Sequence, residues 1–379
     1  MIKRSFWIEK IKSRLKKKNI LWLAGVRRVG KTYLCKSLDK IEYFDCEIPK
    51  DRHYIEDTEA FLNKVKGKTV VIDEIHRLKN PSEILKIAAD YHKKTNIIAT
   101  GSSMLGASIK FKDTLTDRKT TLWLTPMIKS DLEDFKNKSL EHRYLHGGLP
   151  PFFLSKNLPE ENFQDWMDSY WAKDIQELFR LLNKFSFQRF AELLFIQSGG
   201  IFEATKFTRP CEVSRTAINN YLKVLEETFV IHVIKPFSTY KATEITKAPK
   251  AYSFDTGLMC FYKNWDRLRR DDMGILWEHF VLNEILAHTQ SKKVYYWRDK
   301  RGHEVDFILQ KKGKDPIAIE CKWSSNNFES NGIQAFRRQY PKGKNYVVAQ
   351  DVSRSFSKTY GETTVDFISL DNLIKEVIN

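Results

Sequence analysis

Eight residues near the N-terminus have the spacing of a phosphate-binding loop. Residues 25–32 are Gly-Val-Arg-Arg-Val-Gly-Lys-Thr, which matches G-x-x-x-x-G-K-[ST] between an apolar run and a helical stretch. Glycines let backbone N–H groups approach phosphate oxygens, Lys31 reaches the terminal phosphates, and Thr32 offers a hydroxyl to Mg²⁺. The loop predicts a site for ATP and Mg²⁺. Its predicted cofactor-binding residues are Gly25, Arg28, Gly30, Lys31, Thr32 and Tyr33.

Polar residues also follow two later apolar runs. Residues 69–72 lead into Asp73 and Glu74. We predict that Asp73 joins the metal shell and that Glu74 orients the water that attacks the γ-phosphate. Residues 96–100 lead toward Ser102, which we predict as a γ-phosphate sensor, with an ordinary helix cap as the alternative.

A second set of candidate catalytic residues lies in the last third of the chain. Asp306 lies in one β-rich run, and Glu320 and Lys322 stand two apart in the next, so they face the same side of a strand. Two carboxylates that hold Mg²⁺ and a lysine that activates water are the parts of a metal-dependent nuclease; the alternative is a solvated strand face. Glu278, in an upstream amphipathic helix, completes the set. The predicted catalytic residues are therefore Lys31, Glu74, Asp306, Glu320 and Lys322, and the predicted metal ligands are Thr32, Asp73, Glu278, Asp306 and Glu320.

The middle of the chain contains a helix-turn-helix pattern. Residues 202–208 predict a short helix, and residues 211–226 predict a turn and a second helix capped by Ser214. Residues 230–236 and 251–254 would then be wing strands, which makes this a winged helix for nucleic acid or, as the alternative, a packing module. The residues predicted on its exposed face are Arg215, Thr216, Asn219, Asn220 and Lys223.

These segments divide the chain into three predicted domains of an α/β protein. Up to residue 130, short β-rich runs alternate with helical stretches, which predicts a parallel sheet wrapped by helices and a P-loop ATPase core. Residues 131–262 are mostly helical and predict a lid and a winged helix. Residues 263–379 return to mixed helix and strand, as a nuclease-like domain requires.

Composition narrows the class of partner. The 379 residues include 64 Lys and Arg against 48 Asp and Glu, a net charge of +16 that favours a polyanion, with DNA the first candidate. The alternative is a lysine-rich host composition. Five cysteines without C-x-x-C pairs support neither disulfides nor a zinc site, and no run of 18 apolar residues predicts a membrane span. We expect a cytoplasmic protein.

The motifs together resemble the AAA-type ATPases, and specifically a bacterial and archaeal family that joins such an ATPase to a C-terminal domain of uncharacterised function. The resemblance is carried by residues 25–32, 72–76, 100–103, 147–150 and 248–258. It implies a homo-oligomer. It also implies that Arg118 touches the γ-phosphate in cis or in a neighbouring subunit, although Asp117 replaces the usual glycine and a plain surface arginine is the alternative.

The last third resembles the restriction-endonuclease-like fold, known by its PD-(D/E)XK motif. Two function classes stay open at this point. One is an ATP-hydrolysing enzyme that acts on nucleic acid and cleaves it with Mg²⁺. The other is an ATP-dependent DNA- or protein-binding regulatory module whose nuclease-like domain is non-catalytic. A helicase is disfavoured because no helicase motifs follow the ATPase core.

Overall fold

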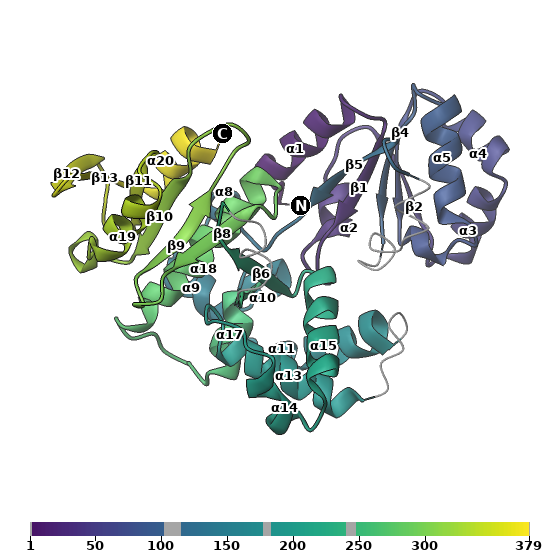
Figure 1. The fold of residues 1–379 in the computed structure, drawn as a ribbon. Helices are drawn as coiled ribbons and strands as arrows, with labels where there is room; N and C mark the ends of the chain where they lie inside the picture. Colours follow the sequence, from purple (N-terminus) through teal and green to yellow (C-terminus); the bar gives the residue numbers. More distant parts are fainter. Residues whose placement is uncertain (1, 102–114, 177–182, 240–247, 379) are drawn as a thin grey trace. The chain divides into compact units, whose positions relative to one another are not determined.

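The computed structural model describes residues 2–101, 115–176, 183–239 and 248–378. They form two compact units, which interleave along the chain: unit 1 holds residues 1–140, 148–184 and 223–230, and unit 2 holds residues 141–147, 185–222 and 231–379. Figure 1 shows the elements of both units. The predicted division into three domains at residues 130 and 262 stays a prediction.

Unit 1 consists of short helices around a central sheet. Its helices are α1 (Ser5–Leu15), α2 (Lys31–Lys36), α3 (Pro49–Glu56), α4 (Thr58–Lys64), η1 (Ile75–Arg77), α5 (Pro81–Tyr91), α8 (Lys129–Asp134), α10 (Pro150–Phe153), α11 (Glu160–Tyr170) and η2 (Trp171–Gln176). Its strands are β1 (Ile20–Ala24), β2 (Ile41–Asp45), β3 (Thr69–Asp73), β4 (Asn96–Thr100) and β5 (Lys119–Trp123).

All neighbouring strands of this sheet are parallel, in the order β2-β3-β4-β1-β5. Strands β1, β3 and β4 are apolar and almost wholly buried, as expected for a parallel sheet covered on both faces. Helices α3, α4 and α5 pack their apolar side chains onto one face (Figure 1). Because β4 lies between β1 and β3, the carboxyl ends of these three strands meet at one edge, where parallel sheets bind ligands. The α/β core predicted from the sequence is confirmed.

Unit 2 combines a helical part with a larger sheet. Its helices are α9 (Leu140–His146), α13 (Lys184–Ile196), α14 (Thr205–Cys211), α15 (Arg215–Glu227), α17 (Thr256–Tyr262), α18 (Asp272–Thr289), η3 (Ser325–Asn327), α19 (Asn331–Gln339), α20 (Leu370–Asn372) and η4 (Leu373–Ile378); α9, α13 and α15 each extend into unit 1 at one end. Its strands are β6 (Ile231–Pro236), β7 (Lys250–Ser253), β8 (Val294–Arg298), β9 (Glu304–Leu309), β10 (Ile317–Lys322), β11 (Asn345–Ala349), β12 (Phe356–Tyr360) and β13 (Thr363–Ile368).

The eight strands form one mixed sheet in the order β12-β13-β11-β10-β9-β8-β6-β7. Strands β8, β9 and β10 are an antiparallel meander, and β11 then pairs with β10 in parallel after the crossover through α19. The apolar face of α19, with Ile333 and Phe336 fully buried, covers one side of the sheet. Helix α18 packs against β10, and the Trp277 indole donates to Val348 O at 2.9 Å. The predicted amphipathic helix is therefore longer than expected and buried around most of its circumference.

The two predicted wing strands form a hairpin that is part of the larger sheet. Residues 231–236 and 250–253 do pair in antiparallel fashion, but β6 also pairs in parallel with β8, so the two strands extend the large sheet at one edge. Ile231 and Ile234 of this hairpin are buried. Its interpretation as the wing of a winged helix stays a prediction. Helices α14 and α15 do form the predicted helix-turn-helix, and the Ser214 hydroxyl accepts from Ala217 N at 3.2 Å.

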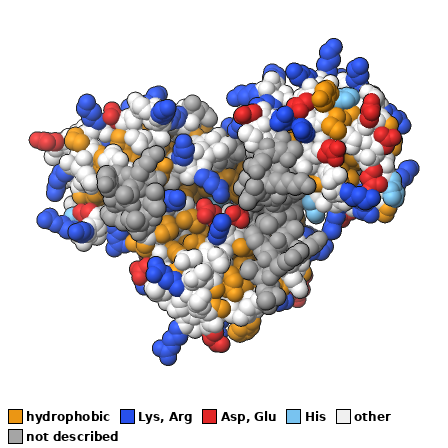
Figure 2. Space-filling view, turned by 45° about the vertical axis from the view of Figure 1, so that its right-hand side comes forward, with side chains coloured by type: hydrophobic (Ala, Val, Ile, Leu, Met, Phe, Trp, Pro, Cys, Tyr) orange, Lys and Arg blue, Asp and Glu red, His pale blue; other side chains and the backbone are white. Residues whose placement is uncertain are grey.

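The positive charge is spread widely. On the face drawn in Figure 2, Lys and Arg side chains are distributed over the surface and do not gather in one patch. The five residues predicted on the outer face of α15, namely Arg215, Thr216, Asn219, Asn220 and Lys223, are all exposed. Among the described residues, no helix combines the length and the apolarity that a membrane span needs.

Candidate functional site

The phosphate-binding loop connects β1 to α2 and depends on its two glycines. Gly25 has φ +146° and Gly30 has φ +97°, a region that favours glycine. A Cβ on Gly25 would lie 2.6 Å from Leu124 O, because the loop starts directly beside the end of β5. Any other residue at position 25 would push the loop away from that strand. The loop therefore has its shape because of residue type as well as spacing.

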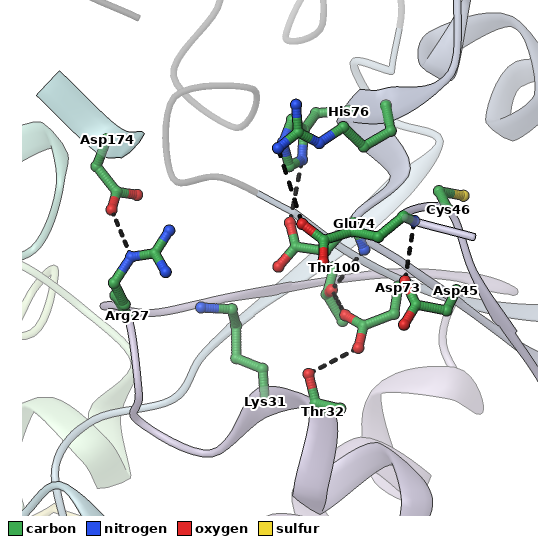
Figure 3. A network of polar contacts seen from close by, with 12 residues as sticks. Arg27, Lys31, Thr32, Asp45, Cys46, Asp73, Glu74, His76, Thr100 and Asp174 are labelled. Atoms are coloured by element: carbon green, nitrogen blue, oxygen red, sulfur yellow. Dashed lines mark hydrogen bonds and ion pairs between the residues drawn. The ribbon is translucent and has the colours of Figure 1, made fainter. Parts of the chain in front are cut away.

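Lys31, Thr32 and Asp73 lie together at the carboxyl edge of the sheet (Figure 3). The Lys31 ammonium donates to Gly25 O at 2.8 Å and to Val26 O at 3.1 Å, and burial lowers its pKa. The Thr32 hydroxyl donates to Asp73 Oδ2 at 2.7 Å. Mg²⁺ binds oxygen ligands, and in phosphate-binding proteins the protein supplies only one or two of them. The Thr32 hydroxyl and the Asp73 carboxylate are ligands of this kind. The residues present therefore fit Mg²⁺ bound with ATP.

Two hydroxyls that the sequence analysis missed also contact Asp73. Both Thr100, the last residue of β4, and Tyr43 on β2 donate to this carboxylate. Thr100 occupies this place because β4 lies between β1 and β3 in the sheet order. The sequence signal for Thr100 was present, since it ends an apolar run, but our prediction went to Ser102 instead. Ser102 lies outside the described residues.

Glu74 begins the turn after β3 with a left-handed backbone, φ +51°. Its Oε2 is 3.1 Å from His76 Nδ1. Burial by itself raises the pKa of Glu74, but the His76 hydrogen bond and the nearby charges of His76, Lys31 and Arg27 outweigh burial and leave this pKa below its ordinary value. Glu74 is therefore a carboxylate at neutral pH, as a water-orienting group must be.

A pocket of about 700 Å³ opens beside the loop. It is large enough for a nucleotide. Six of the predicted cofactor-binding residues line it: Gly25, Arg28, Gly30, Lys31, Thr32 and Tyr33. Its apolar wall includes Ile2, Phe135, Pro150, Pro151 and Leu154. Arg118 is not among the lining residues; its guanidinium pairs with Asp90 Oδ1 on α5 at 2.8 Å. Its contact with phosphate stays a prediction.

Two arginines outside the motif's fixed positions hold the loop in place. Arg4, fully enclosed before α1, donates to Val29 O in the loop at 2.9 Å and forms a two-pronged pair with Asp131 at 2.9 and 2.7 Å. Arg27 pairs with Asp174 at 2.9 Å (Figure 3). The pairs with Asp131 and Asp174 span more than a hundred residues of sequence, so no local sequence pattern predicts them.

Unit 2 contains a second concentration of charge, here named the carboxylate cluster: Lys250, Glu278, Glu304, Asp306, Glu320 and Lys322. Asp306 Oδ2 accepts from Cys321 N at 2.8 Å, which joins β9 to β10 beside Glu320. Glu320 Oε2 lies 2.9 Å from Lys322 Nζ, so these two side chains share a face. The structure thus brings together the predicted residues of the last third.

Burial controls the protonation of this cluster. Burial and the neighbouring charge of Asp306 raise the pKa of Glu278 to about 7 and that of Glu320 to about 8. A divalent cation would reverse this effect by stabilising the charged carboxylates. Among the described residues, no three His, Cys, Asp or Glu side chains are arranged as a metal-ligand set. Mg²⁺ needs only one or two carboxylates when phosphate supplies further oxygens, so Asp306 and Glu320 fit such an ion.

Three members of the neighbourhood were not predicted as site residues: Lys250, Tyr252 and Glu304. Lys250, on β7, pairs with Glu304 and lies 3.8 Å from Glu278 Oε1. The Tyr252 hydroxyl, two residues on, donates to the same Glu278 oxygen at 2.6 Å. Both Lys250 and Tyr252 belong to the segment 248–258 that carried part of the family resemblance, but nothing in their spacing connected them to Glu278.

The chain matches three family models in succession. Residues 17–132 match an AAA domain. This range contains the loop, Asp73, Glu74 and the five-stranded parallel sheet. Residues 17–132 form an AAA-type P-loop ATPase domain. Residues 137–269 and 273–369 match two domains of unknown function, DUF8612 and DUF4143.

Relatives of the chain match most of its length. An uncharacterized protein of Mycobacterium tuberculosis is 25% identical over 347 residues, which cover 88% of this chain and 77% of the relative. An uncharacterized protein of Methanocaldococcus jannaschii is 24% identical over 368 residues, covering 79% and 81%. Among solved structures, a Walker-type ATPase of Pyrococcus abyssi aligns with a TM-score of 0.47 and 15% identity, over 69% of this chain and 96% of that one.

Proposed function

We propose that the chain hydrolyses ATP in unit 1 and acts on nucleic acid, with DNA the first candidate, which unit 2 cleaves in a Mg²⁺-dependent reaction. The observation that carries the second half is the carboxylate cluster, where Asp306, Glu320 and Lys322 converge from adjacent strands. Lys250 and Glu320 are each only 5% exposed, and burying an ion costs several kcal/mol unless it is compensated, a cost that function explains better than packing does.

ATP hydrolysis follows from the groups that line the pocket. With ATP bound, Lys31 would exchange its two loop carbonyls for phosphate oxygens, and Thr32 and Asp73 would hold Mg²⁺, which would supply positive charge to the phosphates. Glu74, ionised at neutral pH, orients the attacking water. Arg4 fixes Val29 O, so the loop keeps its backbone shape when Lys31 moves to the phosphates.

Nucleic-acid cleavage is assigned to the other unit. Mg²⁺ held by Asp306 and Glu320 would polarise the scissile phosphate and lower the pKa of a water. Lys322 remains beside Glu320 and favours the deprotonated nucleophile through its positive charge. The exposed polar face of α15 supplies phosphate contacts, which suits the overall charge of +16.

The test is a direct assay of purified protein with ATP and either Mg²⁺ or Mn²⁺ on single-stranded DNA, double-stranded DNA and RNA. We expect cleavage of at least one substrate. Asp306→Ala should abolish cleavage and weaken Mn²⁺ binding, whereas Lys322→Ala should abolish cleavage and leave Mn²⁺ binding nearly intact. ATP hydrolysis should survive both changes. If wild-type protein leaves all three substrates intact, the nuclease proposal fails.

A second candidate function is an ATP-dependent binding module without nuclease activity. The observation that favours it is that both lysines of the cluster are already paired with carboxylates: Lys322 with Glu320, and Lys250 with Glu304. In that case the exposed face of α15 would still bind nucleic acid, in a manner that depends on nucleotide state. Tight DNA binding without cleavage would select this function.

A further inference from the structure

Lys250 is an unusual member of the carboxylate cluster. It comes from β7, outside the meander β8-β9-β10 and the helix α18 that supply the other five side chains. Only 5% of its surface is exposed. Its ammonium pairs with Glu304, lies 3.8 Å from Glu278 Oε1 and donates to Tyr252 OH at 3.4 Å. A buried lysine is rare unless several partners compensate its charge, so this position is specific.

The cluster therefore has two sides, each with its own lysine. On one side Lys322 contacts Glu320 at 2.9 Å, next to Asp306. On the other side Lys250 lies between Glu278 and Glu304. Arg298 also contacts Glu304, at 3.6 Å. Counted together, four carboxylates then face three basic side chains, which leaves one negative charge when every group is ionised. One divalent cation already outweighs that charge, and a second would add to the excess.

Tyr252 fixes the second side. Its hydroxyl donates to Glu278 Oε1 at 2.6 Å, the same oxygen that faces Lys250. Because this oxygen already accepts from a hydroxyl and lies near an ammonium, a divalent ion there would meet a positive charge a few ångströms away. The Coulomb repulsion between such charges amounts to several kcal/mol at an effective dielectric constant of about 20.

We propose that Lys250 is a built-in cation that occupies the Glu278–Glu304 side of the cluster and confines divalent metal binding to Asp306 and Glu320. This rests on the proposed metal-dependent function of unit 2, but it gives Glu278 a different role from the metal ligand predicted from sequence. Lys250 is thus a positioning residue that weakens the affinity of the cluster for divalent cations and limits their number to one.

The test is Mn²⁺ binding to the nucleotide-free full chain, followed by electron paramagnetic resonance or calorimetry. All proteins carry Asp73→Asn, so that the ATP site lacks the carboxylate proposed to hold its metal. Lys250→Met removes the internal cation, and we expect Mn²⁺ affinity to rise by about tenfold or more, or a second ion to bind. If Lys250 has a purely structural role, Mn²⁺ binding should be unchanged or weaker in Lys250→Met. The direction of the change in affinity therefore distinguishes the two roles.

Two matched controls isolate charge from packing. The double variant Lys250→Met/Glu304→Gln restores the original net charge and should return Mn²⁺ affinity toward the wild-type value. Lys293→Met, at an exposed position of the same unit, should change the affinity little. If Lys250→Met alone does not fold, the double variant is compared with Glu304→Gln, and loss of the ammonium in that background must again tighten Mn²⁺ binding.

Mn²⁺ affinity that is unchanged or lower without Lys250 overturns the inference. Failure of the proposed function gives a different result: wild-type protein then binds Mn²⁺ and leaves nucleic acid uncut, while the Lys250 variants still show tighter binding. If neither wild-type protein nor Lys250→Met binds Mn²⁺, both the metal site and the role of Lys250 are rejected.

Discussion

The P-loop pocket and the carboxylate cluster both gather charged side chains, but the partners of those charges differ. In unit 1, Lys31 rests on backbone carbonyls and faces a pocket of about 700 Å³. In unit 2, Lys250 and Lys322 rest on carboxylates, and Glu320 is only 5% exposed. One site keeps room for a large anionic ligand, whereas the other has already paired much of its charge.

This difference shows how each site depends on the rest of the molecule. The phosphate-binding loop is continuous in sequence and made mostly of backbone, so a few residues determine its chemistry. The carboxylate cluster is assembled from β7, α18, β9 and β10, and its protonation depends on their mutual burial. We therefore expect substitutions in the loop region of unit 1 to change ATP binding and hydrolysis directly. Substitutions in the cluster of unit 2 should act by changing its charge balance.

The largest expected effect is on ATP turnover. Glu74→Gln should lower the rate of ATP hydrolysis by about a thousandfold while nucleotide binding persists, because the amide cannot act on water as the carboxylate does. Lys31→Ala should instead weaken nucleotide binding. Steady-state phosphate release and fluorescent-nucleotide titration separate the two effects. Glu47→Gln, which also lines the pocket, is the matched control and should retain turnover. Hydrolysis at the wild-type rate in Glu74→Gln would remove Glu74 from the mechanism.

The next effect is on the stability of unit 1. Arg4→Met leaves the buried Asp131 carboxylate without its cation, which costs about 3–5 kcal/mol of unfolding free energy. Lys3→Met breaks an exposed pair with Asp39 and should cost at most about 1 kcal/mol. Urea unfolding with and without ATP measures both. Equal losses in the two variants would mean that Arg4 does not hold the loop through its buried pair.

The third effect is a pH dependence in unit 2. Because the folded pKa of Glu320, about 8, exceeds the unfolded value of 4.5, the folded state retains a proton that the unfolded state loses. The stability that this group contributes is complete below about pH 4.5 and declines as pH rises toward 8, by at most about 1.4 kcal/mol per pH unit.

Glu320→Gln imitates the protonated side chain, so its stability relative to wild type should increase between pH 5.5 and pH 8. Thermal unfolding in EDTA measures the stability difference between the two proteins. The transition of unit 2 is identified as the one whose midpoint ATP does not shift. A difference between the two proteins that stays constant across this pH range would show that Glu320 titrates near its ordinary pKa.

The smallest expected effect concerns nucleic-acid affinity. Arg215→Ala combined with Lys223→Ala removes two exposed cations from α15. The slope of log affinity against log salt should become shallower by about one unit for each lost phosphate contact. Lys206→Ala on α14, a lysine paired with Glu203, is the control and should leave the slope nearly unchanged. An unaltered slope in the double variant would place the contact surface elsewhere.

Some parts of this structure were predictable because residues close together in the sequence determine them. Residues 25–32 and the apolar runs of β1, β3 and β4 identify a P-loop and a parallel sheet, since each is defined by neighbours in sequence. Thr100 was missed because its role comes from the order of the strands. The position of β6 between β7 and β8 was missed because only its parallel pairing with β8 reveals it. A hairpin alone gives the same sequence pattern in either place.

The sequence by itself determined which residue types were available: a glycine-flanked lysine for phosphate, and Asp306, Glu320 and Lys322 at strand spacing. Only the tertiary structure decided what those groups contact. Arg4 donates to Val29 O in the loop. Lys250, on β7, lies 3.8 Å from Glu278 on α18. The physical reason is that the energy of a charge pair depends on the distance between the two groups in space. The separation of the two residues along the chain does not determine that distance.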